Sequence, residues 1–256
     1  MKLLENKICL ITGAGGGIGA GAALVFAKEG AKLALIGRTL ATLEETRKQT
    51  EALGAETICI SADVSKSADT RRMVEEIVAR FGRLDCALNN AGIDGVMAPV
   101  ADYPEDEWDK VIAINLKGIF NCLQAEIPAM RAAGGGAILN ISSASTQPIM
   151  PMMSAYVTSK YGVNGLTMNA AFEVARENIR INGMIVGVVS TPMAEHFASL
   201  HPEVYQSMVL EHAMRRLGTV EEIGDAAAWM LSDRNSFMTG ANVAVDGGWS
   251  LARRGM

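Results

Sequence analysis

A glycine-rich turn that follows a short apolar run constrains the fold of this chain more than any other feature. Ile8 to Ile11 are four consecutive apolar residues that predict a buried strand, and Ala20 to Glu29 is typical of a helix. Glycine has no side chain to hold the backbone away from a bound phosphate. The free N–H groups at the start of the helix would face that phosphate with a favourable dipole. The glycines between the two elements are Gly13, Gly15, Gly16, Gly17 and Gly19.

The spacing of these glycines is Thr-Gly-x-x-x-Gly-x-Gly, from Thr12 to Gly19. It differs from the G-x-G-x-x-G pattern of many dinucleotide-binding folds, and a glycine-rich connection between a strand and a helix also occurs without a ligand. The turn therefore favours nucleotide binding, and the residues downstream have to decide between the two interpretations.

Composition argues against several classes of protein. Of the 256 residues 49% are hydrophobic and only 20% charged, with a formal net charge of −5, which is typical of a compact enzyme and unlike a nucleic-acid-binding surface. No apolar run reaches the length of a membrane span, and the first residues do not resemble a signal peptide. We therefore expect a cytoplasmic protein that binds neither membranes nor nucleic acids.

The cysteines and histidines show no spacing typical of a metal site. The four cysteines occur singly on apolar segments, which indicates buried thiols in a reducing compartment. The three histidines fall in one late region at spacings that match no helical ligand pair, so we expect no metal. These residues are Cys9, Cys59, Cys86 and Cys122, and His196, His201 and His212.

Apolar periodicity predicts strands that alternate with helices. Strands are expected at residues 8–11, 32–36, 57–61, 84–88, 137–141, 180–186 and 241–245, and helices at 20–29, 40–53, 68–81, 105–131, 154–173 and 221–231. This alternation, without repeats or linkers, predicts an α/β fold with one doubly wound parallel sheet of about seven strands in a single domain, residues 1–256. Residues 188–216 lack a regular pattern and are long for a connection, so we expect an irregular substrate-binding loop or lid there.

The end of the second predicted strand bears on the choice of cofactor. In dinucleotide-binding units an acidic residue about 20 positions beyond the glycines accepts bonds from the ribose 2′-OH. Here that region reads Gly37-Arg38-Thr39 and contains no carboxylate. A guanidinium there would hold a 2′-phosphate, which favours NADP(H) over NAD(H). Alternatively, Arg38 is only a solvated charge at the end of a strand.

Two further strand ends carry polar or small residues. Asp63-Val64 follows the third predicted strand, and Asp63 would either accept from an adenine amino group or introduce the next turn. Asn89-Asn90-Ala91-Gly92 follows the fourth, where small residues and amides suit the ligand crevice of an open α/β sheet. Asparagines are also ordinary turn formers. Asn115 lies among apolar residues, so its amide needs a partner, either structural or catalytic.

Tyr156 and Lys160 lie four residues apart on a predicted helix, so both side chains share one face. A phenol has a pKa near 10, and lowering it by about three units requires roughly 4 kcal/mol in favour of the phenolate. An ammonium group about 4 Å away supplies about that much at an effective dielectric constant of 20. In a site that is partly shielded from water, the pair would then act as a proton donor. Such a pair also occurs on protein surfaces, where the Tyr ring packs against the aliphatic part of the Lys side chain.

The order of these motifs resembles the short-chain dehydrogenase/reductase family over essentially the whole chain. The residues that carry the resemblance are Thr12-Gly13-x-x-x-Gly17-x-Gly19, Asn89-Asn90-Ala91-Gly92, Asn115, Ser143 and Tyr156-x-x-x-Lys160. The resemblance implies a Rossmann-type sheet and a hydride transfer between a nicotinamide cofactor and a carbonyl or alcohol carbon. The combined match is far more specific than any one of these motifs.

The resemblance also implies a role for each residue. Tyr156 would be the general acid/base, Ser143 a hydrogen-bond donor to the substrate oxygen, and Lys160 the residue that holds the nicotinamide ribose and lowers the pKa of Tyr156. Asn115 would order a water that relays protons through Lys160. Along the cofactor the resemblance places Gly13, Gly17, Ile18, Gly19, Arg38, Thr39, Asp63, Val64, Asn90, Ala91, Gly92, Val189 and Thr191.

One position departs from the family pattern. The family usually has Asn-x-x-x-Pro-Gly after the sixth strand, and here Asn182 to Gly187 has Val186 at the proline position. Gly187 and Thr191 remain, so we expect cofactor binding to survive. The course of the loop beyond is less constrained, because Val does not fix φ as Pro does.

Methionines dominate the expected substrate pocket. Apolar, adaptable residues suit a bulky or hydrophobic ketone or secondary alcohol, although several of them would equally suit the core or a subunit contact. The candidates are Met150, Met152, Met153, Val188, Met193 and Phe197, with Ser145, Ile93 and Val96.

Two alternatives remain. Relatives that reduce 3-oxoacyl groups on an acyl carrier protein dock it with two arginines, and these positions are Gly134 and Glu177 here, with Arg131 and Arg176 nearby. That substitution counts against the role. A non-catalytic dinucleotide-binding sensor would be free to lose its proton donor, whereas all four polar positions are present. The family usually forms tetramers or dimers, and we expect a homotetramer or a dimer.

Overall fold

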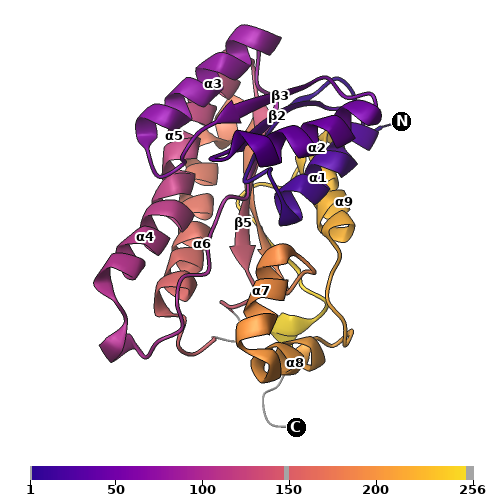
Figure 1. Ribbon diagram of the computed structural model, residues 1–256. Coiled ribbons are helices and arrows are strands. Elements are labelled where there is room, and N and C mark those ends of the chain that lie inside the picture. The colour runs from indigo at the N-terminus through magenta and orange to yellow at the C-terminus, as the bar shows by residue number, and fades with distance from the viewer. Residues whose placement is uncertain (1, 147–149, 252–256) are drawn as a thin grey trace.

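The computed structural model describes residues 2–146 and 150–251. The strands are β1 (Ile8–Thr12), β2 (Lys32–Gly37), β3 (Thr57–Ser61), β4 (Cys86–Asn89), β5 (Gly136–Ser143), β6 (Ile179–Val186) and β7 (Asn242–Val245). The α-helices are α1 (Gly17–Lys28), α2 (Leu40–Ala52), α3 (Ser67–Phe81), α4 (Glu105–Asn115), α5 (Lys117–Ala132), α6 (Ser154–Val174), α7 (Pro192–Leu200), α8 (Pro202–Glu211) and α9 (Val220–Leu231). Figure 1 shows these elements as one body around the sheet.

The strands form one parallel sheet in the order β3-β2-β1-β4-β5-β6-β7. The chain runs outward from β1 to β3, returns to β4 beside β1, and then runs outward in the other direction. The carboxyl ends of β1 and β4 therefore flank the point where the strand order reverses, which is where open α/β sheets bind ligands. The predicted doubly wound parallel sheet is confirmed.

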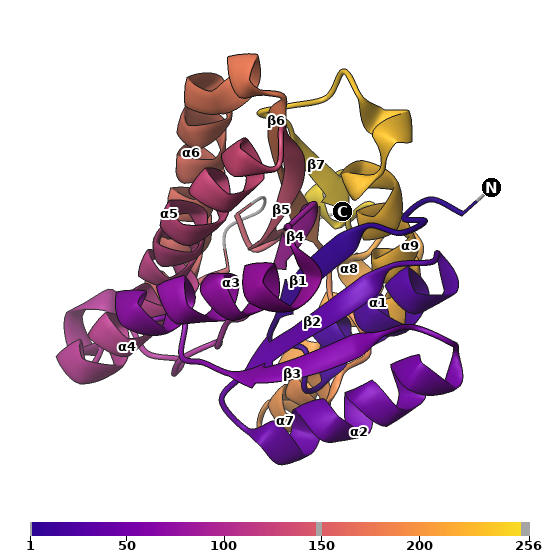
Figure 2. The ribbon, with the colours of Figure 1, turned by 90° about the horizontal axis from the view of Figure 1, so that it is seen from above.

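Helices cover both faces of the sheet (Figure 2). Successive side chains of a strand point to opposite faces, so β1 contributes Cys9 and Ile11 to one buried cluster and Ile8 and Leu10 to the other. The first cluster includes side chains of α1, α2 and α9, and the second includes side chains of α3, α5 and α6. The short apolar strands are thus buried on both faces, as expected for parallel strands between layers of helices.

Two sequence predictions of helical structure are wrong. The expected helix over 105–131 is broken at Leu116 into α4 and α5, next to Asn115, whose buried side chain bonds to the backbone of Ile93. Residues 188–216 were expected to be irregular, but they contain α7 and α8 (Figure 1). Both of these short helices begin at a proline, Pro192 and Pro202, which is favourable at a first helical position but is easily taken for a loop signal.

The described part of the chain contains no helix with the combination of length and apolar character that crossing a membrane requires.

Candidate functional site

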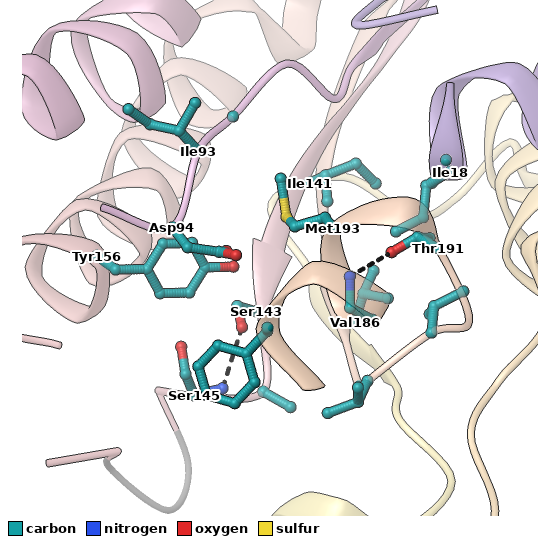
Figure 3. Close-up of a pocket in the computed structure, with 18 of the residues that line it drawn as sticks. Ile18, Ile93, Asp94, Ile141, Ser143, Ser145, Tyr156, Val186, Thr191 and Met193 are labelled. Carbon is teal, nitrogen blue, oxygen red and sulfur yellow. Dashed lines mark hydrogen bonds between the residues drawn. The ribbon is translucent and has the colours of Figure 1, made fainter. Parts of the chain in front are cut away.

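A cavity of about 480 Å³ opens at the carboxyl ends of the central strands. Its volume lies within the range of small-molecule sites. Its wall combines the glycine turn, the segment after β4, the end of β5, one face of α6 and the segment from β6 through α8 (Figure 3). The predicted site residues in this wall are Gly13, Gly17, Ile18, Asn90, Ala91, Gly92, Ser143, Ser145, Met150, Met153, Tyr156, Lys160, Val188, Val189, Thr191, Met193 and Phe197.

The glycine turn forms a tight cradle at the start of α1. Gly13 has a φ of +69°, and a Cβ there would lie 2.9 Å from Nδ2 of Asn90. A Cβ on Gly19 would overlap the carbonyl oxygen of Gly13. No side chain caps the first N–H groups of α1, and its first turn holds no acidic residue. The cradle therefore fits an anionic group such as a pyrophosphate, which those N–H groups and the helix dipole would hold.

Thr12 holds this turn against the segment after β4. Its Oγ1 accepts hydrogen bonds from the backbone N–H groups of Asn90 and Ala91, at 2.9 and 3.1 Å. The amide Nδ2 of Asn90 donates to the carbonyl of Thr12 at 3.0 Å. The two strand ends at the reversal point are thus fixed together, which gives Asn90 a structural task in addition to its place in the cavity wall.

The residues expected at the adenosine end of a cofactor lie outside the cavity wall. Arg38 and Thr39 are exposed after β2. Oδ1 of Asp63 accepts hydrogen bonds from the backbone N–H and the hydroxyl of Ser65, so Asp63 forms the turn that was one of its two predicted roles. The carbonyl of Val64 accepts from Nδ2 of Asn121 at 2.8 Å. A role of these residues in cofactor binding stays a prediction.

Tyr156 on α6 lies opposite the end of β5, which carries Ser143 (Figure 3), and Lys160 of the same helix also lines the cavity. The ammonium of Lys160 donates a 3.0 Å hydrogen bond to the carbonyl of Ile141 and lies 5.7 Å from the centroid of the Tyr156 ring. Oγ of Ser143 accepts from the N–H of Ser145 at 3.2 Å, which leaves its proton available to another partner. The structure thus gathers a phenol, a hydroxyl and an ammonium around one cavity.

Burial dominates the electrostatics of the pair. Burial and the neighbouring carboxylate of Asp94 raise the pKa of Tyr156 above its ordinary value, and the Ser143 hydroxyl opposes this rise. Burial lowers the pKa of Lys160 to about 8, while Asp94 opposes the shift. That Lys160 lowers the pKa of Tyr156 stays a prediction, while the structure shifts both groups toward their neutral forms. The physical reason is that burial away from water disfavours both the phenolate of Tyr156 and the ammonium of Lys160. The ammonium also bonds to a backbone carbonyl rather than to the phenol.

Asn115 has the structural partners that its buried position requires. Its Nδ2 donates to the carbonyl of Ile93 at 2.9 Å and to Oγ of Ser159 at 3.2 Å, and its Oδ1 accepts from the N–H of Ile93 at 2.9 Å. These bonds fix the segment after β4 against α4 and α6. Proton relay through an ordered water at this residue stays a prediction.

The predicted substrate pocket is largely present. Met150, Met153, Val188, Met193 and Phe197 line the cavity together with Ile93, whereas Met152 and Val96 are exposed and lie outside its wall. The lining residues that were not predicted from the sequence include Asp94, Tyr205, Met208 and Trp249. The sequence position of Asp94 could have indicated a place in this wall, because it lies two residues after Gly92 at the sheet edge where ligands bind. The other three come from a helix that was not predicted and from the C-terminal segment.

His212 anchors α8 to the end of β6. Its Nε2 accepts from the N–H of Val188 at 3.2 Å, so the proton lies on Nδ1, which donates to the carbonyl of Met208 at 2.7 Å. Its ring lies 5.0 Å from that of Trp249, measured between centroids. Among the residues described, no group of three or more His, Cys, Asp or Glu side chains is arranged to hold a metal ion.

Val186, which stands at the usual proline position, remains part of the sheet. It pairs with Val245 of β7, and its carbonyl accepts from the N–H of Ala144 at 2.9 Å. Gly187 then passes so close to the backbone of Asp246 that a Cβ would lie 2.8 Å from Cα of Asp246. The loop after β6 is therefore positioned by close packing rather than by a fixed proline φ. Beyond it, Oγ1 of Thr191 accepts from the N–H of Ala194 and caps α7 (Figure 3).

Comparison with known proteins gives one consistent result. Residues 13–250 match the family model described as enoyl-(acyl carrier protein) reductase. The chain is 38% identical to a cyclohexanol dehydrogenase of Acinetobacter sp., with 96% of each chain covered. It is 36% identical to a 3-oxoacyl-[acyl-carrier-protein] reductase of Thermotoga maritima, over 96% of this chain and 98% of that protein.

Solved structures agree with these relatives. The crystal structure of levodione reductase superposes with a TM-score of 0.94 at 35% identity, covering 98% of this chain and all of that one. NAD⁺-bound xylitol dehydrogenase superposes with a TM-score of 0.91 at 35% identity, covering 96% of this chain and all of that one. The fold, the motifs at the cavity and these full-length likenesses together mean that the chain belongs to the short-chain dehydrogenase/reductase family.

Proposed function

We propose that this enzyme uses a nicotinamide cofactor to interconvert an apolar or bulky ketone and the corresponding secondary alcohol, with Tyr156 as the general acid/base. The observation that carries the proposal is the convergence of Tyr156, Ser143 and Lys160 on the cavity that the glycine turn also lines. The apolar remainder of the wall favours a hydrophobic substrate. The names of two relatives, cyclohexanol dehydrogenase and levodione reductase, indicate cyclic substrates of this kind.

The reduced cofactor would supply a hydride to the carbonyl carbon. As the carbonyl π bond opens, Tyr156 donates its proton to the oxygen, and Ser143 donates a hydrogen bond to the same oxygen. Tyr156 is protonated at neutral pH and so holds the proton that the reduction needs, although burial makes it a weaker acid than an ordinary phenol. Lys160 would hold the nicotinamide ribose, and Asn115 would order the water that returns the proton.

The preferred cofactor is NADP(H). Gly37-Arg38-Thr39 places a cation and no carboxylate at the end of β2, where a ribose hydroxyl or a 2′-phosphate would lie. The residues along the cofactor are those of the glycine turn and of the segments after β2, β3, β4 and β6. We further propose a homotetramer or a dimer and a cytoplasmic location.

Two measurements test this function. Consumption of NADPH or NADH with a panel of cyclic and aliphatic ketones, followed by absorbance, tests the reaction. For the cofactor, Arg38→Asp is expected to reverse the preference for NADPH, because a carboxylate repels the 2′-phosphate and accepts from a ribose hydroxyl. Arg71→Asp, at an exposed position on α3, is the matched control. An unchanged ratio of kcat/KM for the two cofactors in Arg38→Asp would refute the cofactor assignment.

Reduction of 3-oxoacyl groups on an acyl carrier protein is less favoured. Docking of an acidic carrier requires free surface cations. Of the two nearby arginines, Arg176 is exposed, and Arg131 forms a two-bond ion pair with Glu177 in which its Nη2 lies 2.9 Å from Oε1 of Glu177. The pairing neutralises the charge of Arg131.

A further inference from the structure

Asp94 faces the same space as the proposed proton donor. It lies in the segment between β4 and α4 and lines the cavity together with Tyr156. Figure 3 shows its carboxyl group beside the hydroxyl of Tyr156, and the two groups are close enough for the charge of Asp94 to act on the phenol. Asp94 therefore lies where it would meet a substrate whose oxygen is bonded to Tyr156.

The surroundings of Asp94 leave its carboxylate without a hydrogen-bond donor. Across residues 2–146 and 150–251 no group donates a hydrogen bond to it, and the side chain is only half-buried. Ile93, Met153 and Met193 in the same wall are apolar. Burial raises the pKa of Asp94, while the charges of Lys160 and His196 oppose that rise. A bound substrate would displace water from this carboxylate, so a substrate that offers it a hydrogen-bond donor gains free energy over one that does not.

Building on the proposed function, we propose that Asp94 selects substrates with a hydroxyl group on the carbon next to the reacting carbonyl. The two oxygens of such an α-hydroxy ketone, or of the corresponding vicinal diol, lie about as far apart as two hydrogen-bonded atoms. One oxygen would bond to Tyr156 and Ser143, and the adjacent hydroxyl would donate to Asp94.

A neutral hydroxyl fits this position better than an amine. Lys160 already brings positive charge toward Asp94, from α6. A cationic substrate would be repelled by Lys160 at close range. A hydroxyl supplies the missing donor without adding charge.

The test compares two ketones that differ by one hydroxyl, cyclohexanone and 2-hydroxycyclohexanone. We expect the wild-type enzyme to have the higher kcat/KM with the hydroxy ketone. Asp94→Leu removes the acceptor at similar size and should lower the ratio of kcat/KM between the two ketones by roughly ten- to a hundredfold, the usual effect of a hydrogen bond to a charged group. Asp94→Asn keeps an acceptor oxygen without charge and should lower the ratio less. Asp225→Leu, at an exposed position on α9, is the matched control and should leave the ratio unchanged.

The outcomes separate this inference from the function on which it rests. An equal ratio in the wild type and Asp94→Leu, with both ketones reduced, would overturn the role of Asp94 and leave the proposed function intact. Failure of the wild type to reduce either ketone with NADPH or NADH would contradict the proposed function, and the inference with it. Cofactor binding, measured by tryptophan fluorescence, identifies correctly folded variants. If Asp94→Leu does not fold, Asp94→Ala is expected to give the same loss.

Discussion

Glu126 is a buried acid that makes the stability of this protein depend on pH. It lies on α5, is fully buried, and its Oε2 accepts a 3.0 Å hydrogen bond from Nδ2 of Asn89. The same Nδ2 donates to Oδ1 of Asn140, whose Nδ2 donates to Thr167. Within the described residues Oε1 of Glu126 and Oδ1 of Asn89 have no partner. A proton on Glu126 would let it donate to such an acceptor, whereas a carboxylate cannot.

The size of the effect follows from the pKa. Burial raises the pKa of Glu126 from 4.5 to about 7, against the opposing hydrogen bond from Asn89. The folded state therefore holds this proton more tightly than the unfolded state does, so the contribution to stability is complete below pH 4.5 and is lost as pH rises through about 7. A shift of 2.5 units at about 1.36 kcal/mol per unit gives a loss of about 3 kcal/mol, most of it between about pH 5 and pH 8.

Glu126→Gln removes this dependence. A Gln side chain is neutral at every pH, accepts from Nδ2 of Asn89 through its oxygen, and can donate to Oδ1 of Asn89 through its amide. The free energy of unfolding, measured in urea at fixed protein concentration from about pH 5 to pH 8, should fall more steeply in the wild type than in the variant, by about 2 to 3 kcal/mol over the range. Glu75→Gln, an exposed site on α3, is the control and should follow the wild type. Parallel curves for the wild type and Glu126→Gln would refute the reasoning.

Two other substitutions test the walls of the cavity. His212→Phe keeps a ring against Trp249 but leaves the N–H of Val188 without its acceptor, at a cost of about 1–3 kcal/mol. We therefore expect a higher KM for the ketone, measured by steady-state kinetics. An unchanged KM would contradict the role of His212 in anchoring α8 to the end of β6. Gly19→Ala would push a Cβ against the carbonyl of Gly13 and displace the turn, so NADPH affinity, measured by fluorescence titration, should fall. Gly165→Ala has no atom within 4 Å of its added Cβ and serves as the control.

Much of the fold could be predicted because the strands are short, apolar and regularly spaced. The strand at residues 57–61 agrees with β3 at both ends, and the others differ by one to a few residues. The break at Leu116 and the helices α7 and α8 could not be predicted, because they depend on a long-range bond from Asn115 to Ile93 and on packing over the cavity. Local periodicity carries no information about such contacts.

The candidate site was predictable for a different reason. Gly13, Asn90, Ser143 and Tyr156 lie at strand ends or on one helix face, and the parallel topology brings those positions to the same edge. The raised pKa of Tyr156 was missed because burial and the approach of Asp94 decide it, whereas Asp94 itself could have been noticed two positions after Gly92. The spacing of Tyr156 and Lys160 could indicate that they share a face, but not that the ammonium would bond to Ile141.

The most direct test of the central claim is the single-turnover reduction of a cyclic ketone by Tyr156→Phe preloaded with NADPH. The variant loses only the phenolic proton, so cofactor binding should survive while the rate of cofactor oxidation falls by about a hundredfold or more. Ser143→Ala should show a smaller loss, because it removes a hydrogen bond and leaves the proton in place. Full-rate turnover by Tyr156→Phe would contradict the assignment of the proton donor and the mechanism derived from it.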